Sequence, residues 1–157
     1  TILKKGADSF MGISDKNDII YLAYDSIVEY LDVDYTVTAR SNISNPVLSY
    51  LMYEIEFKNG RRYLWYDKKE HKIAVMDSGA DASEFDASSW QLILRDDFQK
   101  QTERKEGAPM IFPVSYEIYV SHDKASLAVI EVLNGTKTLY RGTFVKSSQL
   151  NIYPYSA

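Results

Sequence analysis

The strongest periodic pattern near the start of the chain is helical. Between Asp15 and Leu31, apolar residues return every three or four positions, so they would share one face of a helix. Ser14 or Asp15 can cap this helix, and Asp18 would lie near its positive end. The apolar positions are Ile19, Leu22, Ala23, Ile27, Tyr30 and Leu31. The pattern predicts a helix from Asp15 to Leu31.

Strand-like alternation of apolar and polar residues follows. The stretch DYTVTAR, residues 34–40, alternates before the turn-forming stretch SNISNP. The stretch YEIEFKNGRRYLWY, residues 53–66, alternates on both sides of Asn59 and Gly60, a pair typical of two-residue hairpin loops. A third strand is expected from Lys72 to Met76. These patterns predict an antiparallel sheet after the first helix.

Both faces of the predicted hairpin carry large aromatic side chains. With Asn59 and Gly60 in the loop, Glu54 would lie opposite Trp65 on the neighbouring strand. One face would hold Phe57, Ile55, Leu64 and Tyr66, and the other Lys58, Glu56, Glu54, Arg61, Tyr63 and Trp65. Because a sheet that lies on one core buries only one face, the second face needs another layer of this chain or a partner.

The polar, acidic stretch from Asp77 to Ser89 is the best place for a domain boundary. It predicts two units, residues 1–79 and 80–157, with one continuous domain as the alternative. The carboxylates of this stretch, Asp77, Asp81, Glu84 and Asp86, do not have the spacing of a calcium loop. We interpret them as linker residues and as caps of the helix that follows.

Beyond this stretch, the pattern predicts a second helix and then more strands. Polar residues continue the segment without a turn signal until Gly107, which favours a helix from Trp90 to Lys105 over a strand. Its apolar face would consist of Trp90, Ile93, Leu94 and Phe98. After Pro109, alternation predicts the strands Met110–Val120, Ala125–Leu133, Thr136–Val145 and Asn151–Tyr153, with Asn134 and Gly135 in a tight hairpin.

The predicted order, a helix followed by strands, occurs twice. Residues 53–77, YEIEFKNGRRYLWYDKKEHKIAVMD, resemble PepSY-type modules, which are small cystatin-like units. Residues 115–144 are similar to the end strands of the cone-shaped folds typified by nuclear transport factor two. These resemblances imply bacterial cell-envelope proteins that bind rather than react. We therefore expect an α+β fold of one or two cystatin-like units, each a helix packed on a curved antiparallel sheet.

The composition is that of a globular protein. The chain has 157 residues, of which 45% are hydrophobic and 25% charged, and no apolar run approaches the ~20 residues of a membrane-spanning helix. The net charge of -4 gives no reason to expect nucleic acid as a partner. Cysteine is absent, which excludes a disulfide framework. The N-terminus has neither an initiating Met nor a signal-peptide core, so we expect removed upstream sequence and an extracytoplasmic or cell-surface location, with the cytoplasm as alternative.

No sequence motif points to catalysis. His71 and His122 are the two histidines, and each lies in a polar turn. No phosphate-binding loop, nucleophile elbow or zinc-ligand spacing is present in the sequence. A catalytic pair of buried carboxylates is left as an alternative, because such a pair needs no local sequence motif. We expect no catalytic residue, no metal site and no cofactor, and an enzyme is the less favoured class.

Protein binding is the function that these features favour. Positive charge is concentrated between Lys58 and Lys72, which include six basic and two acidic side chains. We expect Trp65 and Tyr63 to anchor a protein partner, with Arg61 and Lys58 at the rim to steer it. Basic residues also protect sheet edges, and the predicted helices could cover the second face instead. The alternatives are a small-ligand-binding protein or enzyme with a cone-shaped sheet around a Tyr-lined pocket, and an acidic inhibitor or immunity-type protein.

Overall fold

The computed structural model describes residues 22–58 and 60–154, and these residues form ten strands. The strands are β1 (Ile27–Tyr30), β2 (Val33–Ser44), β3 (Ser49–Phe57), β4 (Gly60–Asp67), β5 (Lys72–Ala80), β6 (Trp90–Arg104), β7 (Met110–Ser121), β8 (Ser126–Leu133), β9 (Thr136–Val145) and β10 (Leu150–Tyr153). The only helical segments in this part of the chain are the short 3-10 turns η2 (Ala82–Glu84), η3 (Ala87–Ser89) and η4 (Ser147–Gln149). None of these is long and apolar enough to cross a membrane.

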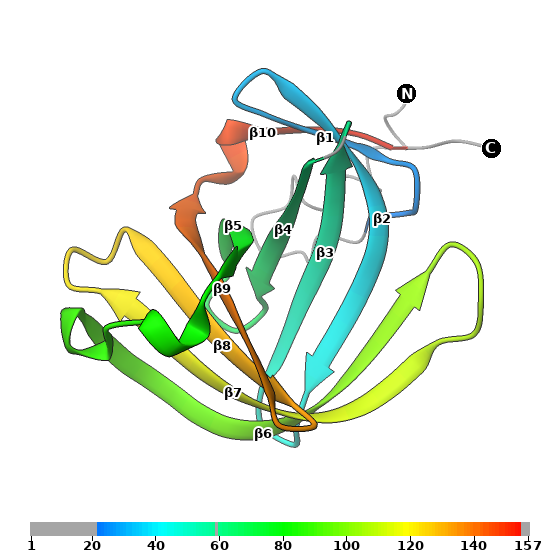
Figure 1. Cartoon of the computed structure of the whole chain (residues 1–157). Coiled ribbons are helices and arrows are strands. Elements are labelled where there is room, and N and C mark those ends of the chain that lie inside the picture. The colour runs from blue at the N-terminus through cyan, green and yellow to red at the C-terminus, as the bar shows by residue number, and fades with distance from the viewer. Residues whose placement is uncertain (1–21, 59, 155–157) are drawn as a thin grey trace.

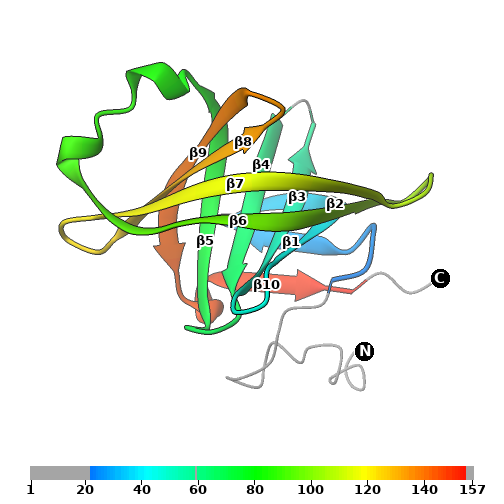
Figure 2. The same ribbon diagram turned by 90° about the horizontal axis from the view of Figure 1, so that it is seen from below.

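Strands β2 to β9 close into an antiparallel barrel (Figure 1). Two four-stranded meanders, β2–β5 and β6–β9, meet along two seams. At one seam β5 pairs with β9, and at the other β2 pairs with β6. Figure 2 shows β6 and β7 crossing over the strands of the first meander. The residues on both sides of the predicted boundary therefore belong to one sheet.

The two ends of the barrel differ in their connections. The β3–β4, β6–β7 and β8–β9 hairpins lie at one end, which we call the mouth end. The β2–β3, β4–β5 and β7–β8 hairpins lie at the other, the far end. Strand β6 is 15 residues long, and together with β7 it forms a hairpin that extends away from the barrel (Figure 1).

The connection from β5 to β6 runs outside the barrel from the mouth end to the far end. Asp81 and Asp86 cap the turns η2 and η3, and each side chain accepts a hydrogen bond from the backbone two residues later. The Ser88 hydroxyl and backbone lower the pKa of Asp86, and the Ser83 backbone and hydroxyl lower the pKa of Asp81. Asp81 and Asp86 therefore cap two short 3-10 turns, whereas the helix that they were expected to cap is strand β6. Among the described residues, no group of acidic or histidine side chains could hold a metal ion.

A small apolar cluster attaches this connection to the barrel wall. Phe85 contacts Trp90 and Tyr119, with ring centroids 5.7 and 4.9 Å apart. The buried members of the cluster on β7, β8 and β9 are Tyr119, Ala128, Ile130 and Leu139. The connection therefore covers part of the outer face of β7, β8 and β9.

Replacing Phe85 by alanine is expected to lower the free energy of unfolding by about 1–2 kcal/mol. The side chain is only partly buried, so the loss should be smaller than the ~3–5 kcal/mol of a fully buried phenylalanine. Chemical denaturation measures the change, and Val47→Ala, at a position that is 80% exposed, is the control. A loss below ~0.5 kcal/mol would show that the connection does not stabilise the barrel.

The two faces of the β3–β4 hairpin belong to two different cores. Trp65 and Tyr63 point into the barrel, where they belong to the interior cluster with Tyr116, Phe98 and other side chains from β5 to β9. Tyr53 and Tyr66 point outward, where β1 and β10 cover them. This second core also contains Leu22, Val28, Tyr30, Tyr35, Val37, Leu51, Ile55, Leu64, Ile73, Val75, Leu150 and Ile152. Both faces are aromatic because both are buried within this chain.

A β-bulge allows strand β2 to contribute to both cores. Val37 pairs with Ile55, but Ala39 pairs with Glu54, so Thr38 is an extra residue in β2. Tyr35 and Val37, before the bulge, face the outer core. Ser41 and Ile43, after the bulge, face the barrel interior. The burial pattern in sequence alternates without interruption across the bulge. Periodicity alone could not show this change of face.

The expected α+β fold is wrong. The described residues contain ten strands and no α-helix, and the barrel has no cystatin-like unit in which a helix packs on a curved sheet. The resemblance to PepSY-type modules is therefore also wrong, because it was based on strand and hairpin patterns that many antiparallel folds share. The second face of the hairpin is buried because the sheet closes into a barrel around it.

The first predicted helix is wrong wherever it can be compared. Residues 22–31 contain a turn and strand β1 (Ile27–Tyr30), while residues 15–21 lie outside the described part of the chain. Val28 and Tyr30 are buried in the outer core, and Glu29 between them is half-buried. Pairing with β2 and β10 makes this segment a strand. Its short apolar run fits the residue spacing of a helix as well as that of a strand.

The second predicted helix, Trp90–Lys105, is also wrong because residues 90–104 form strand β6. From Leu94 onward, alternate side chains of β6 face the interior, but several of them are polar. Lys100, Thr102 and Arg104 line the interior in place of apolar residues. A bulge at Ile93 further breaks the alternation near Trp90. These two features hide the strand period, so the segment is read as a helix from its sequence.

The strands predicted by alternation are confirmed, with one error of register. Asn134 and Gly135 both have positive φ and form the β8–β9 hairpin loop, as predicted. In the first hairpin, however, Phe57 pairs with Gly60, so Gly60 begins β4 instead of closing the loop. Trp65 therefore lies opposite Met52, not Glu54. Because the register differs by two residues, each side chain keeps its predicted face.

Candidate functional site

The barrel interior contains a cavity of about 210 Å³ near the mouth end. Seven of the eight barrel strands contribute to its wall, so the cavity lies inside the barrel. Its lining residues are Ser41, Met52, Glu54, Tyr63, Lys100, Thr102, Arg104, Met110, Phe112, Leu133 and Tyr140. The lining combines apolar side chains with hydroxyl and charged groups, unlike the apolar interior around Trp65.

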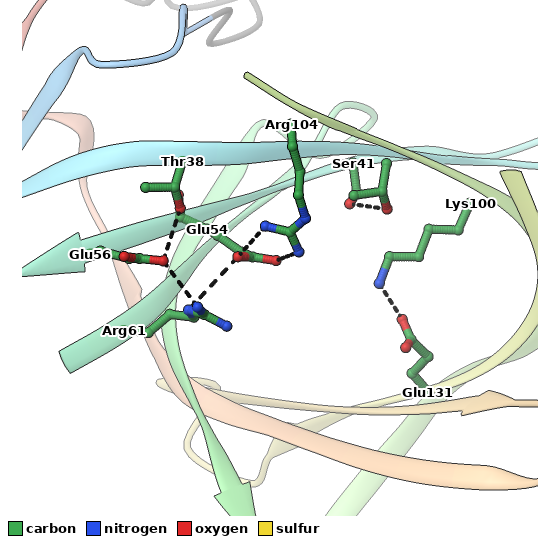
Figure 3. A network of polar contacts seen from close by, with 9 residues as sticks. Thr38, Ser41, Glu54, Glu56, Arg61, Lys100, Arg104 and Glu131 are labelled. Atoms are coloured by element: carbon green, nitrogen blue, oxygen red, sulfur yellow. Dashed lines mark hydrogen bonds and ion pairs between the residues drawn. The ribbon is translucent and has the colours of Figure 1, made fainter. Parts of the chain in front are cut away.

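The most buried charged residues at the cavity form an ion pair next to a tyrosine. The Lys100 Nζ donates to Glu131 Oε1 over 2.7 Å, and the Tyr116 hydroxyl donates to the same oxygen over 2.6 Å (Figure 3 shows the ion pair). The side chains of Lys100 and Glu131 are only 11% and 7% exposed. Burial raises the pKa of Tyr116 far above its usual value, and the negative charge of Glu131 adds to the effect. Tyr116 is therefore a hydrogen-bond donor at any physiological pH.

A second ion-pair network lies nearer the mouth. Both Nη atoms of Arg104 donate to the carboxylate of Glu54, at 3.0 and 2.8 Å. Arg61 binds Glu56 at 3.0 Å and lies 3.7 Å from Glu54, and Thr38 donates to Glu56 (Figure 3). Hydrogen bonding to Tyr63, with the charge of Glu54, raises the pKa of Arg61. This network connects β2, β3, β4 and β6 across one side of the mouth.

Depth separates the two groups of charges. Arg104 follows Lys100 by four residues on β6, which corresponds to about 13 Å along a strand. Half of the Arg104 side chain is exposed, whereas Lys100 is buried. The cavity therefore has a solvent-accessible charged rim and a buried charged floor.

Two tyrosines face the space between rim and floor. The rings of Tyr63 and Tyr140 pack edge to face with centroids 4.9 Å apart. Burial raises the pKa of Tyr140, with further contributions from the negative charges of Glu131 and Glu54, so its hydroxyl stays protonated. Within the described part of the chain this hydroxyl has no hydrogen-bond partner, although the Tyr140 side chain is buried and lines the cavity. It is available to a molecule in the cavity.

The Arg104–Glu54 pair is expected to contribute little to stability. Because the arginine is half exposed, a double-mutant cycle of Arg104→Gln and Glu54→Gln should give a coupling energy of about 1 kcal/mol or less. The coupling should fall further as salt is added, since exposed charges are screened. Denaturation at low and high ionic strength measures it. A coupling above ~2 kcal/mol that is independent of salt would mean that the pair is effectively buried.

The structure separates the four predicted binding residues. Trp65 and Tyr63 are 2% and 8% exposed and lie inside the barrel, and only Tyr63 lines the cavity. Arg61 lies in the ion-pair network at the mouth, next to Tyr63. Lys58 is exposed in the β3–β4 turn, where its ammonium lies 5.2 Å from the Phe57 ring centroid. These residues do not form one surface, and the prediction of a protein partner stays a prediction.

The most buried charged residues were missed by sequence reasoning. Lys100 and Glu131 are far apart in sequence, and neither belongs to a motif. The one signal was the spacing of Lys100, Thr102 and Arg104 at every second position, which places three polar side chains on one face of a strand. That signal has meaning only once the strand is known to line a closed barrel.

Comparison with protein-family models, with curated proteins and with solved structures finds no match for this chain. The interpretation of function therefore depends on the cavity and the residues that line it.

Proposed function

We propose that this protein binds a small molecule in the cavity at the mouth end of the barrel. The observation that carries the proposal is the buried charged floor, where Lys100 lines the cavity and binds Glu131, which also accepts a hydrogen bond from Tyr116. Concave sites with an apolar wall and a few convergent polar groups are the usual form of ligand pockets. Ligand binding in a Tyr-lined pocket is one of the alternatives to protein binding that the sequence leaves open.

Stability alone does not explain the buried pair. Removing two charges from water is expensive, and apolar residues of similar volume in their place are often neutral or stabilising. A barrel of this size already has two aromatic-rich cores to hold it together. A polar floor next to empty space therefore favours a role in recognition.

The cavity volume limits the size of the ligand. Its 210 Å³ lies below the roughly 300–1,000 Å³ of ordinary ligand pockets. The ligand is therefore small, or only part of a larger molecule enters. Its apolar part would contact Met52, Phe112 and Leu133, and its polar part would meet Lys100 and Tyr140. Location outside the cytoplasm stays a prediction.

A fragment screen with a blocked-cavity variant tests the proposal. Leu133 lines the cavity, while its neighbour Val132 lies on the opposite side of β8. Leu133→Trp should fill part of the cavity and weaken bound fragments at least tenfold, whereas the matched variant Val132→Trp should bind them as the native protein does. Thermal shift and ligand-observed NMR measure binding. The proposal is rejected if no fragment binds, or if Leu133→Trp binds every fragment as tightly as Val132→Trp does.

A further inference from the structure

Each charged side chain that lines the cavity has a partner of opposite sign. Lys100 is paired with Glu131, and Arg104 with Glu54. Arg61 is paired with Glu56 at the rim and also lies near Glu54. Positive and negative charges are therefore equal in number among these residues. The cavity presents no net charge that an ionic ligand would neutralise.

Several hydrogen-bond donors on the cavity wall nevertheless have no acceptor among the described residues. Lys100 has three N–H groups, and within the described residues only Glu131 accepts from it. The Tyr140 hydroxyl has no partner there, as described above. The hydroxyls of Ser41 and Thr102 lie 2.8 Å apart, so one of them donates to the other and the second proton remains available. The N–H groups of Lys100 and the hydroxyl of Tyr140 thus offer donors to one small space.

We infer that the ligand is an uncharged molecule with an acceptor oxygen, such as the carbonyl of an amide, ester or ketone, on a small apolar body. The inference rests on the proposed function, because it specifies the molecule that the same cavity would hold. A neutral acceptor satisfies Lys100 and Tyr140 and adds no charge to a balanced site. An ion would lose its hydration and find no unpaired counter-charge.

Three probes of nearly the same shape separate these possibilities. Benzamide, benzoate and benzamidine each have one aromatic ring with a planar head group, and at neutral pH they are neutral, negative and positive. We expect benzamide to bind the native protein at least tenfold more tightly than either ion. Isothermal titration and ligand-observed NMR at constant ionic strength measure the three affinities.

Variants of the floor should change the preferred charge in opposite directions. Glu131→Gln removes the negative partner of Lys100, so benzoate should become the preferred probe, with at least a tenfold gain over its affinity for the native protein. Lys100→Met leaves Glu131 uncompensated, so benzamidine should be preferred instead. The double variant removes both charges and should again favour benzamide. Circular dichroism and thermal unfolding confirm that each variant is folded.

The native protein and the double variant keep the test decisive if a single variant does not fold. A preference for benzoate or benzamidine in the native protein overturns the inference, and so does the same order of probes in all folded variants. Failure of benzamide to bind the native protein also overturns it. In these cases the proposed function stands if other fragments bind and Leu133→Trp excludes them. If no fragment binds at all, both proposals fail.

Discussion

Replacing Gly142 by alanine is expected to disrupt the closure of the barrel, with a loss of about 3 kcal/mol or more in the free energy of unfolding. A Cβ atom at this position would lie 1.8 Å from the carbonyl oxygen of Val75 and 2.6 Å from the Cα of Met76. Both are backbone atoms of the neighbouring strand β5, so they cannot move away as a flexible side chain would. Overpacking of a well-packed interior already costs about 1–3 kcal/mol, and a clash with backbone exceeds that case.

The position of Gly142 makes the effect global. Gly142 pairs with Met76 on β5 and with Leu127 on β8. The β5–β9 seam is one of the two that join the meanders, so separating β9 from β5 opens the barrel. Loss of this seam would also expose the interior cluster around Met76. The expected product is a partly unfolded or aggregating protein.

Gly60→Ala is the matched control for this prediction. The Cβ of an alanine at position 60 would lie 3.4 Å from the Phe57 carbonyl oxygen, which is an ordinary contact. This variant should remain within about 1 kcal/mol of the native protein. Denaturant titration and size-exclusion chromatography measure both variants. Native stability of Gly142→Ala would contradict the close approach of β9 and β5.

Truncating Trp65 to alanine is expected to cost about 3–5 kcal/mol of stability. The side chain is 2% exposed, its ring stacks on Tyr50 with centroids 4.8 Å apart, and it meets Tyr116 edge to face at 6.1 Å. Removing a buried aromatic side chain leaves a cavity that the rigid barrel wall cannot fill. The loss would affect the interior core directly and the cavity floor through Tyr116.

The controls for this variant are chosen by burial. Trp65→Phe keeps an aromatic ring in the core and should recover most of the lost stability. Trp90→Ala removes a partly exposed tryptophan on the outer wall and should cost less than Trp65→Ala. Thermal and chemical denaturation measure all three. If Trp65→Ala left stability nearly unchanged but abolished contact with a protein partner, the side chain would be part of an exposed surface and its place in the barrel would be contradicted.

The β-hairpins are the part of this fold that local sequence predicts. In the β8–β9 hairpin, Asn134 and Gly135 accept positive φ, so the turn and its register follow from two adjacent residues. In the first hairpin, Lys58 has positive φ, and the turn moves by one residue toward the N-terminus. The faces of its strands are unaffected by this change, so both aromatic faces could be recognised without the structure.

The candidate site depends on contacts that local patterns do not contain. Glu131 on β8 reaches Lys100 on β6 across β7, and Arg104 reaches Glu54 although 50 residues separate them in sequence. Because the polar residue Lys100 occupies an interior position of β6, this strand lacks the alternation of apolar and polar residues by which a strand is recognised. Predictions from periodicity therefore fail most clearly in β6, where polar residues line the cavity.

Sequence by itself determined most of the alternating strands, the turn of the β8–β9 hairpin, and that the first hairpin has two aromatic faces to bury. These properties depend on neighbouring residues, because side-chain direction and turn geometry are local. Tertiary structure alone decided what those faces pack against. The β2–β6 and β5–β9 seams join residues far apart in the chain, and the bulge at Thr38 changes which face of β2 is inside. Closure of the barrel thus turned a sheet with two apolar faces into two cores and a polar cavity, since a sheet without a closing seam encloses nothing.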